Sequence, residues 1–305
     1  MSSRRIILVT LAILAGVVIG IAPSVIQFFA ERELVKLQQR GVRIQVESLS
    51  GFIVGISAKQ VESWLPIGVR TAGVRTIPLQ LQAEDVRVSA GFSPLALQLR
   101  VYAEAAIYGG SAQATFTNLV SAPKVEGAAR GVDVSIHPQL RALGIESGIV
   151  EATITNHPLD GKWKDDASYT LSLDNLEILP PGWLQTMGGI SQVRNGRAVL
   201  RATVRQGGQL SLQSSSFDCS LASGSLQGTA IITESGDLMN VNASIRVNLD
   251  RPDSDKIGRW LPIIAGSGIA SNATSFVCAI RSTRCGATAG ARSFANGCVT
   301  FTCAG

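Results

Sequence analysis

Apolar and polar residues alternate with a period of two along much of this chain of 305 residues. The alternation is clearest in Ile77–Gln82, Asp85–Val88 and Leu95–Tyr102, and it returns in Tyr169–Asp174. Because successive side chains of a strand point to opposite faces, each segment predicts a strand with one apolar and one polar face. Turn residues such as Gly109-Gly110 separate the segments. We therefore expect a mainly β fold, a long antiparallel meander in a curved sheet or a sandwich, with short helices.

The other predicted elements follow from local changes in this pattern. Val132, Val134 and Ile136 alternate as in a further strand. Proline suits the first turn of a helix, so we expect a short helix from Pro138 to Leu143. A helix is also expected over Glu31–Arg40, which is rich in helix-forming residues. Trp183–Met187 and Lys256–Ile264 are the remaining helical candidates.

The N-terminal segment from Ile6 to Ala30 contains no charged residue. As a helix it would be about 37 Å long, more than the roughly 30 Å hydrocarbon core of a bilayer. We expect a membrane anchor with the N-terminus cytoplasmic, since Arg4 and Arg5 precede it. A cleaved signal peptide is the alternative, but no clear small-x-small site is present. The predicted anchor residues are Ile6, Leu8, Leu11, Leu14, Val17, Ile19 and Ile21.

Gly16 and Gly20 form a G-x-x-x-G pattern within this anchor. Such a pattern lets two membrane helices approach closely, so these glycines are candidates for a helix–helix contact. The pattern is common by chance in apolar segments.

Four segments are expected along the chain. Residues 1–30 would form the cytoplasmic start and the anchor, and 31–41 an amphipathic helical connector. Residues 42–283 would form a β domain, with a break near 118–131 if it has two halves. Residues 284–305 lose the alternation. We interpret this tail either as the product of a reading-frame change or degenerate extension, or as a flexible or disulfide-tied tail.

Cysteines are concentrated near the C-terminus. The five are Cys219, Cys278, Cys285, Cys298 and Cys303. An oxidising compartment would allow disulfides and leave one thiol over. No zinc-binding spacing is present, so we expect no metal site.

The sequence offers no catalytic constellation. His137 and His157 each precede a proline and have no partner nearby in the sequence, so we interpret them as turn residues. Nucleophile, metalloprotease and phosphate-binding motifs are missing, which predicts a protein that is not an enzyme and needs no cofactor. The formal charge of +5 and the lack of a basic run argue against nucleic-acid binding.

Several segments carry a resemblance to a known family. They are GVRIQVESLSG (Gly41–Gly51), VYAEAAIYGGSAQATF (Val101–Phe116), VDVSIHPQLRALGIESGIVEATI (Val132–Ile154) and LSLDNLEI (Leu171–Ile178). With the anchor before them, they resemble the AsmA-like group of bacterial envelope proteins, and within it the type II secretion system protein N family. The resemblance extends over roughly residues 1–281 and excludes the tail.

The resemblance implies a single-pass protein of the bacterial inner membrane with a periplasmic β domain. Its partners would be the membrane and other subunits of a protein secretion machine. A lipid-binding or lipid-transfer protein is the alternative, because an uncovered apolar face of a curved sheet can hold acyl chains. An ordinary sandwich core would explain the same face. The candidate groove residues are Leu95, Leu97, Leu99, Val101, Tyr169, Leu171 and Leu173.

Overall fold

The computed structural model describes most of the chain after residue 42. The described residues are 43–52, 54–65, 79–93, 98–117, 122–180, 189–233, 238–258, 272–283, 292–294 and 297–304, together with 24, 27–28, 31–32, 35, 182, 185–186 and 269–270.

Strands dominate the described part of the chain. They are β1 (Arg43–Glu47), β2 (Ser50–Phe52), β3 (Gly55–Leu65), β4 (Leu79–Ser93), β5 (Gln98–Ile107), β6 (Gly110–Thr117), β7 (Lys124–Asp133), β8 (Ile145–Pro158), β9 (Ala167–Ile178), β10 (Val193–Arg205), β11 (Gln209–Asp218), β12 (Ser223–Ile232), β13 (Leu238–Asn248), β14 (Ser275–Thr283), β15 (Arg292–Phe294) and β16 (Gly297–Ala304). The short helices are η1 (Val134–Ile136), α2 (Pro138–Ala142) and α4 (Asp255–Gly258).

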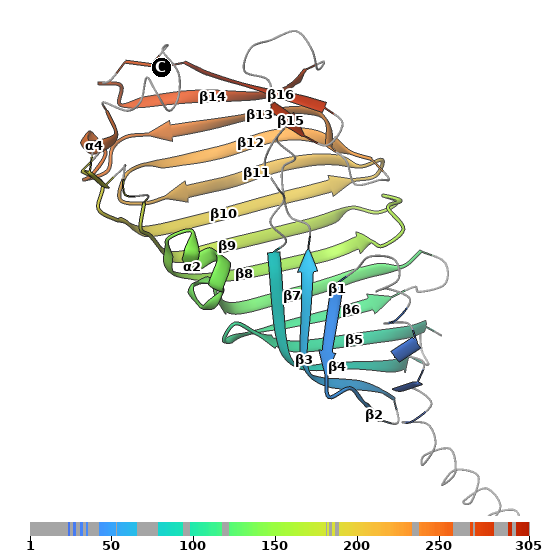
Figure 1. The fold of residues 1–305 in the computed structure, drawn as a ribbon. Coiled ribbons are helices and arrows are strands. Elements are labelled where there is room, and N and C mark those ends of the chain that lie inside the picture. The colour runs from blue at the N-terminus through green and yellow to red at the C-terminus, as the bar shows by residue number, and fades with distance from the viewer. Residues whose placement is uncertain are drawn as a thin grey trace, which may run out of the picture.

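All of these strands join one antiparallel sheet, which confirms the predicted meander. Across the described residues the sheet has 16 strands, and from β3 to β14 each strand pairs with its neighbours in the chain. Figure 1 shows the strands from β8 to β14 stacked one above another in a single layer. β7, which covers most of the predicted break near 118–131, pairs with both β6 and β8.

Bulges keep the apolar side chains of the long strands on one face. Each bulge lies at a shift in the pairing register and contains a residue with positive φ. Asn, Asp and Ser adopt positive φ more readily than bulky residues do. In β4, Asp85 (φ 48°) separates Leu81 and Ala83 from Val86 and Val88, so that both halves face the same side. The equivalent residues in other strands are Asn156, Asn175, Asn195, Ser214 and Asn240.

The first strands turn away from the rest of the sheet at this bulge. β4 pairs with β3 from Leu79 to Ser89, but its pairing with β5 begins only at Glu84. Figure 1 shows β1 and β3 running steeply across the direction of β8–β14. The freed backbone of β4 finds side-chain partners: the Tyr108 hydroxyl donates to Gln80 O and accepts from Gln82 N, each at 3.1 Å.

His137, in the turn between η1 and α2, also bonds to the bent part of β4, which we call the corner. Its Nε2 donates to Gln80 O at 2.6 Å, while Nδ1 accepts from the backbone N–H groups of Gln139 (3.2 Å) and Leu140 (3.4 Å). These partners assign the neutral tautomer with the hydrogen on Nε2. The residue is 2% exposed. The prediction that His137 is a turn residue is confirmed, and its partner comes from a strand 57 positions earlier in the sequence.

Two local predictions differ from the structure. The predicted strand through Val134 and Ile136 is wrong, since Asp133 accepts from Ser135 N and converts the segment into η1. The β5–β6 hairpin turns at Tyr108-Gly109, one residue earlier than predicted, with φ of 45° and 76°. Both residues are left-handed, as the tight two-residue hairpin turn requires.

Several predicted features lie outside the described residues. These are the anchor from Ile6 to Ile21 with Gly16 and Gly20, the groove residues Leu95 and Leu97, the side chain of Leu99, and most of Trp183–Met187 and of the segment after Gly258. In the part of the chain that the structure describes, no helix has the length and apolarity needed to cross a membrane.

The described part of the tail belongs to the sheet. β16 pairs with β14, and a disulfide joins Cys278 to Cys303, which face each other in the two strands. Of the two interpretations of the tail, this is the geometry expected of a disulfide-tied segment. Cys219 is a free thiol in the β11–β12 hairpin.

Candidate functional site

Apolar side chains form continuous rows across one face of the sheet. Pairing registers align one row from Val88 of β4 to Ile280 of β14, and a second from Ala105 of β5 to Leu200 of β10. The first row consists of Val88, Ala103, Ala114, Gly127, Ile154, Tyr169, Ala202, Leu212, Gly228, Ala243 and Ile280. The second consists of Ala105, Ala112, Ala129, Ala152, Leu171 and Leu200. We call these the middle rows. At about 4.8 Å per strand, the first row is roughly 48 Å long.

The middle rows are mostly uncovered. Apart from Ala202, their apolar residues are half-buried or exposed, and Leu171 and Ile154 keep 43% and 37% of their surface accessible. A sandwich would bury such residues under a second sheet. Beside Leu171, Leu200 and Leu226 lies an apolar cavity of about 210 Å³. The face is thus open where an ordinary β-domain has its core.

One side of the middle rows is covered by the β8–β9 connection. The backbone carbonyl of Trp163 accepts from Gly207 N at 3.0 Å, and the indole ring lies against the Gly207-Gly208 turn. Next to this segment, Ala167 and Val204 are 1% and 0% exposed. The connection therefore forms a wall along this side.

Three aromatic rings meet where this wall reaches the middle rows. His157 packs edge-on against both Trp163 and Tyr169, with ring centroids 5.6 and 5.9 Å apart. The Tyr169 hydroxyl and His157 Nδ1 are hydrogen-bonded at 2.6 Å. Burial raises the pKa of Tyr169 to about 12 and lowers the pKa of His157. Both groups are therefore neutral near pH 7, and the polar atoms of Tyr169 and His157 Nδ1 are engaged with each other.

The opposite side is covered by two short segments. Val134 of η1 packs over Gly148, and Leu173 approaches the same point. Further along the sheet, Ile269 and Phe276 form a buried cluster with residues of β13 and α4. The middle rows therefore lie between two walls.

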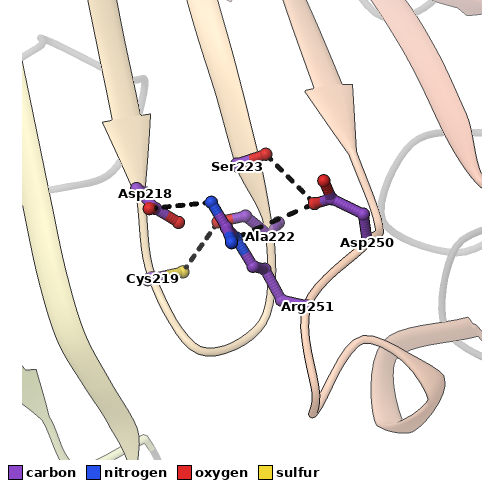
Figure 2. A network of polar contacts seen from close by, with 6 residues as sticks. All are labelled: Asp218, Cys219, Ala222, Ser223, Asp250 and Arg251. Carbon is purple, nitrogen blue, oxygen red and sulfur yellow. Dashed lines mark hydrogen bonds and ion pairs between the residues drawn. The ribbon is translucent and has the colours of Figure 1, made fainter.

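A polar network holds the end of the second wall, as Figure 2 shows. Arg251, which follows β13, donates to Asp218 at the end of β11 (2.8 Å) and lies 3.8 Å from Asp250. Ser223 donates to Asp250 at 3.2 Å, and Cys219 Sγ to Ala222 O at 3.4 Å. The Arg251 pair is partly exposed, so it contributes about 1 kcal/mol at most. Its effect is to fix the β11–β12 hairpin against β13.

The structure places the described groove candidates on one face. Tyr169, Leu171 and Leu173 alternate on β9 and point to the same side of the sheet as Val101 of β5. The alanine-rich half of the rows, in β5–β8, was not among the candidates. The alternation of alanine with Glu104, Gln113 and Thr153 was its sequence signal.

The described residues contain no group of three or more His, Cys, Asp or Glu side chains that could hold a metal ion.

A scan against protein-family models finds no match, and searches of curated proteins and of solved structures find no similar chain.

Proposed function

We propose that this chain is a non-enzymatic lipid-binding protein that holds acyl chains along the middle rows. The observation that supports this most is the apolar face that stays open between two walls built from the chain itself. Covering a half-exposed leucine contributes about 25 cal/mol for each Å² of apolar surface removed from water. A roughly 48 Å row provides room for extended chains.

The walls favour a chain-like ligand over a second sheet. Two packed sheets lie about 10 Å apart over their whole width. The Trp163 segment and the η1 and α4 segments rise at the margins of the face and would obstruct such a partner. An acyl chain needs only the strip between them, and it would leave the internally bonded His157–Tyr169 pair intact.

Native mass spectrometry and displacement of a fluorescent fatty acid, cis-parinaric acid, test this proposal on the purified full chain. Leu171→Asp places a charge on the open strip, and we expect affinity to fall at least about tenfold. Thr170→Asp adds the same charge to the same strand on the opposite face, beside Arg201, and should leave affinity unchanged.

Absence of co-purifying lipid together with absence of probe binding would contradict the proposal. So would equal losses in the two variants when circular dichroism shows both folded. A concentration-dependent dimer abolished by Leu171→Asp, without lipid binding, would assign the face to a second copy.

A role as an inner-membrane-anchored, periplasmic subunit of a secretion machine is the second candidate. The observation that favours it is the position of β1, which lies at one edge of the described sheet just after the predicted anchor. Such edges accept strands from partner proteins. Affinity purification from envelope extract should then recover secretion-system subunits, and recovery of none would contradict this role.

A further inference from the structure

The reverse face of the sheet carries a hollow of about 840 Å³ over β4–β8. Its lining combines mostly polar side chains, from the strand positions that alternate with the middle rows, with Ala103, Ala114, Gly127 and Ile154 of the first middle row. One row across it is Ser89, Tyr102, Thr115 and Glu126, and the next is Arg87, Glu104, Gln113 and Ala128. Phe52 and Val54 lie at one end. We call this site the polar hollow.

Side chains that donate hydrogen bonds and side chains that accept them both line the polar hollow. Hydroxyls and the Gln113 amide can donate and accept, while the carboxylates of Glu104 and Glu126 accept. Arg87 lies 3.7 Å from Glu104, and both side chains are about two-thirds exposed. With one cation and two anions, the lining has a formal charge of −1. It therefore disfavours phosphates, nucleic acids and anionic lipid headgroups.

An aromatic platform lies within the polar hollow. Tyr102 is 43% exposed, and its Cε2 atom lies only 3.0 Å from where a Cβ would stand on Gly91. Because Gly91 has no side chain, the ring lies close against β4 and remains accessible from the solvent. An exposed aromatic ring beside amide and carboxylate groups can pack against the C–H face of a sugar while its neighbours bond the hydroxyls.

We propose that the polar hollow binds a neutral oligosaccharide. Its volume lies in the upper part of the usual range for ligand sites, roughly 300–1,000 Å³, and so fits several sugar rings. A peptide added as a strand would need free backbone groups, whereas the β4–β8 backbone beneath the hollow is engaged in ladders with neighbouring strands. The hollow shares Ala103, Ala114, Gly127 and Ile154 with the first middle row, but Leu171 is not part of its lining, so a change at Leu171 separates the two sites.

Saturation-transfer NMR and calorimetry on the full chain test the site with three neutral probes: cellohexaose, maltohexaose and chitohexaose. At least one should bind, and Tyr102→Ala should weaken it at least tenfold. Gly91→Ala should weaken it as well, because the added methyl displaces the Tyr102 ring. Leu171→Asp, outside the lining of the hollow, should leave sugar affinity unchanged while it reduces fatty-acid binding.

Failure of all three probes to bind would overturn the proposal, and so would binding that survives Tyr102→Ala. Binding of hexalysine at the same residues, with no sugar bound, would also overturn it and assign the hollow to a basic peptide. Circular dichroism spectra of the variants, compared with the parent chain, separate loss of the site from loss of the fold.

Discussion

Replacing His137 with alanine should destabilise the fold by about 3 kcal/mol. The ring caps α2 through two backbone N–H groups, and loss of an N-cap costs about 1 kcal/mol. The ring is also 2% exposed and donates to Gln80 O, so removing that bond and the packing around it adds about 2 kcal/mol. Urea unfolding of the purified chain measures the total.

Two further variants separate these contributions. His137→Asn keeps a side chain that can cap α2 but does not reach Gln80, so it should cost about 2 kcal/mol. His157→Ala removes a half-buried ring with one hydrogen bond to Tyr169 and should cost about 1 kcal/mol.

Hydrogen exchange locates the effect. In His137→Ala the amide of Gln82, which donates to Tyr108, should exchange faster, while amides in β10 and β11 keep their protection. A loss below about 1 kcal/mol, or unchanged exchange at Gln82, would refute the reasoning that this ring holds the corner.

Two other predictions concern the wall formed by the β8–β9 connection. Burial lowers the folded-state pKa of His157, so the unfolded chain takes up its proton first, and stability should fall as pH drops below about 6.5. The pKa of Tyr169 is raised to about 12, so stability should also fall as pH rises from 10 to 12. Ultraviolet titration and urea unfolding at each pH check the two predicted pH dependences. A flat stability profile in either pH range would contradict the corresponding prediction. Gly208→Ala should lower the free energy of unfolding by about 2–3 kcal/mol, because φ is +78° and the new methyl would overlap the carbonyl of Ile232. Gly207→Ala has a similar φ of +80° but open space around the methyl, so it should lower the free energy of unfolding by about 1 kcal/mol. Thermal unfolding of the pair compares them, and equal losses would contradict the overlap argument.

The strands were largely predictable because their pattern is local. Alternation in Tyr169–Asp174 and Leu95–Tyr102 predicted parts of β9 and β5. Residues 79–82 of the predicted segment Ile77–Gln82 and all of Asp85–Val88 lie in one strand, β4. Their change of phase was visible in the sequence. Interpreting it as a bulge at Asp85 required knowing that β3 pairs with residues on both sides of Asp85 and that the pairing with β5 shifts between Glu84 and Arg87.

The candidate site was less predictable. A strand with one apolar face has the same sequence whether that face meets a second sheet, a lipid or water. The walls depend on contacts between distant segments, such as Trp163 with Gly207-Gly208. The partner of His137 is likewise remote in sequence, because Gln80 is brought to it only by the bend in β4.

The pairing of each strand with its chain neighbours has a consequence for how such a protein can grow and fold. From β3 to β14 every added hairpin needs only the strand before it, so the sheet can assemble progressively from either end, as repeat proteins do. Duplication or deletion of a hairpin would lengthen or shorten the apolar strip by about 10 Å without disturbing the remaining ladders. The reach of the strip is thus set by the number of hairpins.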